Sequence, residues 1–156
     1  MRHILPKDAA DMYALNSDPE VLRHTGDSNF VSLAASEQFI RDYPDYRVNG
    51  FGRWAVLRIE DQALLGWCGL KRHPGGMVDL GYRFFQRYWG RGYATEASLA
   101  CLQWGFEVAG LEEVVGRVAK ANTASIRVLE KVGMTFWGEE PCEGIQESLI
   151  YRIRKG

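Results

Sequence analysis

A glycine-spaced turn between two different hydrophobic patterns constrains this chain more than any other feature. Alternating residues before the turn Gly90-Arg91-Gly92-Tyr93-Ala94 predict a strand, and residues after it recur with helical spacing. A helix start leaves its first backbone N–H groups without intrahelical partners and carries about half a positive charge. Glycine permits positive φ and close approach of a ligand to the backbone. The turn therefore predicts a phosphate site at a helix N-terminus.

The bulk properties of the chain exclude several classes of protein. Its 156 residues carry 19 basic and 20 acidic side chains, a net charge of −1, with no long block of one sign. This balance argues against binding to nucleic acid or to an acidic membrane. No stretch reaches the ~18 apolar residues of a membrane span, and the N-terminus lacks an apolar leader. We expect a single cytoplasmic domain over residues 1–156.

The cysteines and histidines do not form a recognisable metal pattern. Cys68, Cys101 and Cys142 are an odd count, without a CxxC pair and without ligand spacing to a histidine. We expect reduced, mostly buried thiols, no metal and no covalent cysteine nucleophile.

Periodicity along the rest of the chain predicts an α+β fold. A strand meander occupies the middle, because three alternating or apolar runs are separated only by short polar or glycine turns. The expected strands are 53–59, 63–71, 77–85, 114–119, 134–137 and 145–153, and the expected helices begin near Asp8, Pro19, Leu33, Tyr93 and Asn122. In the third strand Gly81 is expected to be a bulge or a point of close approach.

Four motifs in this order resemble the GNAT acetyltransferase superfamily, and most of all its ribosomal-protein N-acetyltransferase-like branch. Along the chain they are the short pieces Asp18 to Val21 and Leu80 to Tyr82, the glycine turn Gly90 to Ala94, and the segment Asn122 to Met134. The resemblance covers nearly the whole chain. It implies a mixed, mostly antiparallel sheet of six to seven strands, splayed between strands 4 and 5 and flanked by about four helices.

The resemblance also implies acetyl-CoA as co-substrate and a set of residues that bind it. The turn amides would hold the pyrophosphate, the strand that contains Phe84 and Phe85 would meet the pantetheine arm, and Ser125 would face the sulfur. Arg91 and Lys131 are expected near the phosphates as flanking cations. The expected cofactor-binding residues are Phe84, Phe85, Gly90, Arg91, Gly92, Tyr93, Ala94, Thr95, Asn122, Ser125 and Lys131.

Catalytic residues are less constrained, because this chain departs from the family. Many relatives carry a tyrosine acid on the last helix, where this chain has Leu129, expected to share a helix face with Asn122 and Ser125. Ser125 is expected either to donate to the thiolate or only to cap the sulfur, so the group that protonates the thiolate stays unassigned. Where the acceptor needs a general base, Asp79, on the strand before the turn, is the first candidate and Glu147, on a closing strand, is the second.

The predicted function is transfer of an acetyl group to a primary amine by direct attack in a ternary complex, in a monomer or homodimer. The acceptor is a small molecule or a peptide N-terminus. Loops 25–30 and 141–146 are expected beside it, and Asp27, Glu143 and Glu147 favour a cationic amine. A degenerate module that binds coenzyme A without turnover is the alternative. A dinucleotide or nucleotide loop fits poorly, because the turn matches neither GxGxxG nor GxxxxGK[ST].

Overall fold

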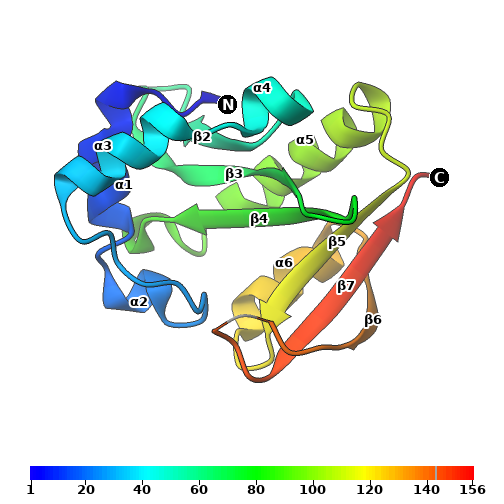
Figure 1. Cartoon of the computed structure of the whole chain (residues 1–156). Helices are drawn as coiled ribbons and strands as arrows, with labels where there is room; N and C mark the ends of the chain where they lie inside the picture. Colours follow the sequence, from blue (N-terminus) through cyan, green and yellow to red (C-terminus); the bar gives the residue numbers. More distant parts are fainter. Residues whose placement is uncertain (143) are drawn as a thin grey trace.

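The computed structural model describes residues 1–142 and 144–156, and its centre is a seven-stranded sheet (Figure 1). The spatial order is β1-β2-β3-β4-β5-β7-β6. The parallel pair β4–β5 is flanked by antiparallel pairs on both sides, so the sheet is mixed and mostly antiparallel as expected. The strands are β1 (Arg2–His3), β2 (Arg53–Leu57), β3 (Leu64–Arg72), β4 (Val78–Phe84), β5 (Glu113–Ala119), β6 (Thr135–Glu139) and β7 (Ser148–Arg154).

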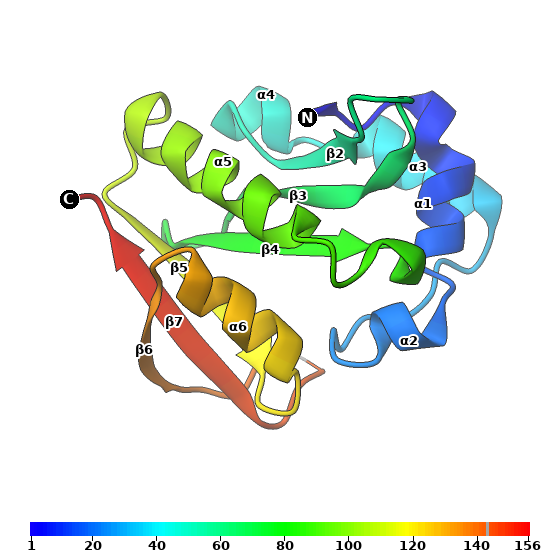
Figure 2. The same ribbon diagram turned by 180° about the vertical axis from the view of Figure 1, so that it is seen from behind.

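Helices cover both faces of the sheet. The longest, α5, packs on β3 and β4 and runs beside α6, which lies over β5, as seen from behind in Figure 2. On the other face α1 packs against α3 and β3. Two of the helices are single turns, so four helices of seven residues or more flank the sheet in the described part of the chain. The helices are α1 (Ala9–Leu15), α2 (Pro19–Leu22), α3 (Leu33–Asp42), α4 (Asp45–Asn49), α5 (Tyr93–Glu107) and α6 (Thr123–Lys131).

The sheet splays between β4 and β5. These strands pair only at Asp79 with Val115 and at Leu80 with Gly116, and then diverge (Figure 1). The pairings on either side, β3 with β4 and β5 with β7, each run through seven residue pairs. Residues 81–84 of β4 therefore present a backbone edge that β5 does not occupy, and such an edge leaves backbone groups available to other partners. One of them is already used, because the Phe84 C=O accepts a hydrogen bond of 2.9 Å from Trp89 Nε1.

Two hydrophobic clusters hold this arrangement in place. The larger lies between the sheet and the α5–α6 layer and includes Leu70, Leu80 and Val114. The smaller lies under α1 and α3 and includes Leu15 and Phe85. Burying the apolar atoms of such side chains stabilises the fold by about 25 cal/mol per Å². Both walls of the splay are thus anchored by packed cores.

None of the helices within residues 1–142 and 144–156 is long and apolar enough to cross a bilayer. Within the same residues no group of three or more histidine, cysteine or acidic side chains is placed to share a metal ion. The cysteines are free thiols, and the buried Sγ atoms of Cys68 and Cys101 lie 3.6 Å apart.

Candidate active site

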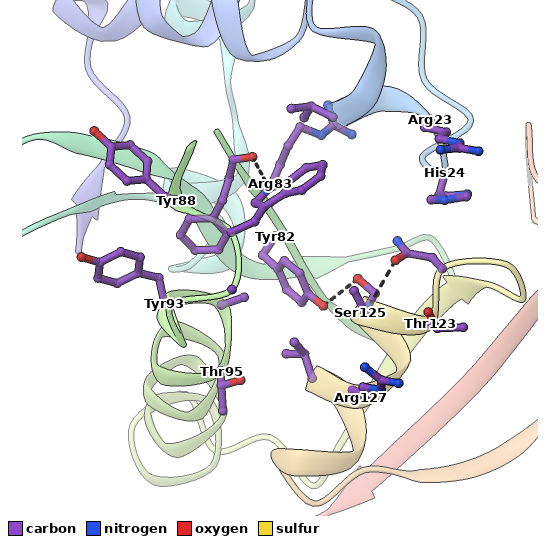
Figure 3. Close-up of a pocket in the computed structure, with 18 of the residues that line it drawn as sticks. Arg23, His24, Tyr82, Arg83, Tyr88, Tyr93, Thr95, Thr123, Ser125 and Arg127 are labelled. Atoms are coloured by element: carbon purple, nitrogen blue, oxygen red, sulfur yellow. Dashed lines mark hydrogen bonds between the residues drawn. The ribbon is translucent and has the colours of Figure 1, made fainter. Parts of the chain in front are cut away.

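A cavity of about 570 Å³ opens where β4 and β5 diverge (Figure 3). Four segments form its walls: α2 with the residues that follow it, the second half of β4, the glycine turn with the start of α5, and the first turns of α6. The two helix starts lie beside the same space, although they are about thirty positions apart in the sequence.

The start of α5 brings backbone amides to the cavity. Gly90 and Gly92 have φ of +73° and +84°, the left-handed conformation that side chains rarely adopt. Gly92 is the N-cap, so no side chain caps the first amides of α5. A Cβ atom at either glycine would meet nothing within 4 Å, which leaves open space in front of the turn. Tyr93, Ala94 and Thr95 follow and also line the cavity.

The start of α6 is built differently. The Asn122 side-chain oxygen accepts a hydrogen bond of 3.2 Å from the backbone N–H of Ser125, which caps the helix. This bond fixes Ser125 in the first turn, with its side chain at the cavity wall. The structure therefore gives Asn122 a structural role that the family resemblance does not imply.

Tyr82 is a candidate site residue that the sequence analysis did not identify. Its hydroxyl lies 2.7 Å from Ser125 Oγ, so a hydrogen bond joins β4 to α6 across the cavity (Figure 3). Burial raises the pKa of Tyr82 to about 12, although the bond to Ser125 acts in the opposite direction. The alternation of β4 places Tyr82 on the apolar face with Leu80 and Phe84. A phenol on a buried face needs a polar partner, which was the available signal.

The described cavity lining is cationic, in contrast to the net charge of −1 of the whole chain. It contains four cationic side chains and one carboxylate, that of Glu20. Glu20 in turn lies 3.6 Å from the Arg23 guanidinium. Arg83 is also paired, with Asp27, so the remaining positive charge of the described lining lies on α6, where it can attract a polyanion. The four cations are Arg23, Arg83, Arg127 and Lys131.

Arg83 occupies the opposite face of β4 from Tyr82. Its guanidinium lies over the Trp67 ring at 5.3 Å and binds the side chains of Asn16 and Asp27. The charge of Asp27, expected to attract a cationic amine, is therefore balanced by an arginine. Thr25 of the same loop lines the cavity, whereas none of the described residues of loop 141–146 does; Glu143 lies outside the described residues.

The structure does not bring Asp79 to the cavity, so the prediction that it is the general base is corrected. Its carboxylate lies 2.8 Å from the Arg53 guanidinium and 3.0 Å from His73 Nε2, in the half of β4 that still pairs with β5. Arg53 reaches it across Gly81, where a Cβ atom would lie 2.8 Å from that guanidinium. Gly81 is therefore a point of close approach, and the β3–β4 register passes it without a bulge.

Two expected cofactor-binding residues and one expected neighbour also lie elsewhere. Phe85 is buried in the cluster under α1 and α3, because the chain turns away from the sheet after Phe84. Arg91 is exposed and is not part of the cavity lining. Leu129 is buried against Gly116 of β5, and Val128 takes the lining position one turn after Ser125. The other expected residues, Phe84, Gly90, Gly92, Tyr93, Ala94, Thr95, Asn122, Ser125 and Lys131, all line the cavity.

Comparison with known proteins places this fold and cleft in a family. The family description "Acetyltransferase (GNAT) domain" matches residues 1–135. The uncharacterized N-acetyltransferase YoaA of Bacillus subtilis (strain 168) is 28% identical over 157 residues, which cover 97% of this chain and 84% of YoaA.

Solved structures agree with the sequence relatives. An acetyltransferase from Agrobacterium tumefaciens str. C58 has a TM-score of 0.84 at 25% identity, covering 99% of this chain and 89% of its own. Spermidine N-acetyltransferase from Vibrio cholerae, solved with CoA and spermine, shares the fold with a TM-score of 0.78 at 15% identity, covering 98% of this chain and 93% of that one. This chain therefore belongs to the GNAT acetyltransferase family and is an acetyltransferase.

Proposed function

We propose that this protein transfers the acetyl group of acetyl-CoA to a primary amine by direct attack within a ternary complex. One observation carries the proposal: a single cavity at the splay joins an uncapped helix start, a cationic wall and a hydrogen-bonded pair of partly buried hydroxyls. We further assign the chain to the ribosomal-protein N-acetyltransferase-like branch, on the motifs around Leu80 to Tyr82 and Gly90 to Ala94.

The residues around the cavity fit coenzyme A. The open amides at the start of α5 suit its pyrophosphate, because an uncapped helix N-terminus offers N–H donors and a positive dipole end. Lys131 and Arg127 on α6 supply charge to further phosphates. The unpaired edge of β4 near Phe84 offers backbone groups to an extended amide-containing arm.

Acetyl-CoA, when bound, supplies a thioester whose carbonyl carbon accepts the amine. The free N–H groups of β4 near Phe84 would hold the oxygen that becomes negative during attack. Direct attack requires no covalent enzyme, which agrees with two buried cysteines that lie outside the cavity lining, Cys68 and Cys101.

The charge arrangement favours a weakly basic acceptor. An α-amine with a pKa near 8 costs about 1.4 kcal/mol to deprotonate at pH 7, whereas a lysine-like amine costs about 4.6 kcal/mol. Glu20, Asp27 and Asp79 are each paired with an arginine among the described residues. A peptide N-terminus or a small amine of similar basicity needs no placed carboxylate, so we favour such acceptors over polyamines.

The test is a screen of free-thiol release from acetyl-CoA with α-amine, lysine-like, polyamine and aminoglycoside acceptors, run beside calorimetric titration with CoA. We expect CoA binding and turnover that is fastest with an α-amine. Tight CoA binding without turnover on any amine would instead support the degenerate binding module. Absence of CoA binding would contradict the proposed function altogether.

A further inference from the structure

The hydrogen bond between Tyr82 and Ser125 leaves one hydroxyl hydrogen unused. Each side chain carries one O–H hydrogen, and a bond of 2.7 Å between the two oxygens consumes one of the two. In the described part of the chain, neither hydroxyl has another hydrogen-bond partner. Whichever residue donates the mutual bond, the other keeps an O–H that is free to rotate into the cavity that both line.

We propose that Tyr82 and Ser125 act together as a single hydrogen-bond donor to the sulfur that leaves the acetyl group. The inference rests on the proposed function, since it concerns the thiol end of bound coenzyme A. It adds Tyr82, a residue of β4, to a role expected of Ser125 on α6 alone. It also supplies a donor that position 129 lacks, because a leucine side chain has no hydrogen-bond donor and Leu129 is buried against β5.

The acidity of the two hydroxyls relative to that of a thiol determines whether this donor transfers its proton or only forms a hydrogen bond. The pKa of Tyr82 is about 12, and a thiol such as that of cysteine has a pKa of about 8.5. Complete proton transfer from the phenol to a thiolate is therefore disfavoured by roughly 10³-fold. The alkyl hydroxyl of a serine is a still weaker acid than a phenol. The pair thus stabilises the thiolate by a charge-assisted hydrogen bond and keeps its own protons.

The transfer then balances without an acid or base on the enzyme. The amine nitrogen forms a bond to the carbonyl carbon, and the carbon–sulfur bond breaks with its electron pair retained by sulfur. The free O–H of the pair donates to that thiolate. The surplus proton on nitrogen passes to solvent, and the thiolate takes a proton from solvent when coenzyme A leaves. The products are an amide and a thiol.

Two donors in series are stronger than one. When Tyr82 donates to Ser125 Oγ, that oxygen becomes a better donor to the sulfur, because hydrogen bonds in a chain polarise one another in a low-dielectric site. When the direction is reversed, Tyr82 is the donor and Ser125 supports it. Loss of either hydroxyl leaves the remaining one able to donate, whereas loss of both removes the donor entirely.

The experiment measures the pKa of the thiol of bound CoA, which needs no knowledge of the acceptor. CoA would be bound to the full-length protein at saturation, and the ultraviolet absorbance of its thiolate followed against pH. The proteins compared are the wild type, Tyr82→Phe, Ser125→Ala and the double variant. Cationic and titratable groups near the pair, which are Arg83 and Cys68 on the sheet, His24 after α2, and Arg127 and Lys131 on α6, stay constant in all of them.

Tyr151→Phe is the matched control. The Tyr151 hydroxyl also joins a strand to α6, through a bond of 3.3 Å to Glu130, but neither residue lines the cavity. We expect this variant to leave the thiol pKa unchanged. Thermal unfolding of each protein would show that the comparison is made between folded molecules.

The proposal predicts a synergistic result. Each single variant raises the thiol pKa by about half a unit or less, and the double variant raises it by about one to two units, more than the sum of the single changes. A double variant that only equals one single variant, or an additive result, would overturn the pair as one donor.

If the double variant does not fold, Ser125→Thr and Ser125→Val in the Tyr82→Phe background keep the comparison, since they differ only in the hydroxyl. Wild-type protein that binds CoA without lowering its thiol pKa overturns this inference alone, and failure to bind CoA overturns the proposed function with it.

Discussion

The two helices that begin at the cavity, α5 and α6, start in opposite ways. The first amides of α5 have no side-chain cap, because its N-cap is Gly92 in the left-handed conformation. The first turn of α6 is capped by Asn122. An uncapped start keeps its N–H donors available to an anion, whereas in a capped start one N–H is bonded to the cap, which fixes the first turn. One helix thus offers backbone to a ligand, and the other holds a side chain, Ser125, in place.

The largest expected effect comes from Gly92→Val. A β-branched residue at φ of +84° is strained by about 1–3 kcal/mol, and the altered turn misplaces the amides that follow it. We expect CoA affinity to fall by about tenfold or more in calorimetry. Gly75→Val is the matched control: φ is +91°, a Cβ there meets nothing within 4 Å, and it lies in the β3–β4 hairpin away from the cavity. It should lose similar stability and keep CoA affinity; equal loss of affinity in both would contradict a special role for α5.

Restoring the family's tyrosine at Leu129 should harm the fold without helping the reaction. Leu129 packs against Gly116, where even a Cβ atom would lie 2.8 Å from Leu129 Cδ2. Leu129→Tyr therefore overpacks the core and should cost about 1–3 kcal/mol in denaturant unfolding. We expect no gain in turnover, with Leu129→Met as the volume-matched control. Faster turnover in the tyrosine variant would show that position 129 reaches the cavity after all.

Removal of the α6 cap should affect stability more than binding. Asn122→Ala deletes the acceptor for the Ser125 N–H and should lower the free energy of unfolding by about 1 kcal/mol. Asn122→Asp keeps an acceptor and should retain most of the stability. The two variants should differ far less in CoA affinity than Gly92→Val differs from wild type. A tenfold loss of affinity in Asn122→Asp would instead indicate that the amide binds the cofactor directly.

The smallest effect is expected from single surface cations. Lys131 lines the cavity, so Lys131→Ala should weaken CoA binding by about two- to fivefold, less at high salt because exposed charges are screened. Arg91 is exposed outside the lining, and Arg91→Ala should have less effect than Lys131→Ala. If Arg91→Ala proves the more damaging, the prediction from sequence is better than the one from geometry at this position.

Local sequence patterns predicted the helices and strands well, whereas site residues that depend on contacts distant in sequence could not be predicted. The glycine turn and the Asn122 cap were readable because positive φ and helix capping depend on a few neighbouring residues. The position of Asp79 was not predicted, because its partner Arg53 comes from β2 and its partner His73 comes from the β3–β4 hairpin that precedes β4. Tyr82 was missed for the same reason, since only the fold brings Ser125 within 2.7 Å of it.

The short pairing between β4 and β5 makes the cleft the place where the two halves of the sheet are most easily separated. Two residue pairs join the strands that carry β1–β3 on one side and β6–β7 on the other, so few backbone bonds resist separation of the two wings. A ligand that contacts both α5 and α6 connects the two halves of the sheet across the cleft. Binding raises the free energy needed to separate the two halves of the sheet by RT ln(1 + [L]/Kd). Occupancy by coenzyme A should therefore slow amide hydrogen exchange along β4 and β5 more than in the distant β2–β3 hairpin.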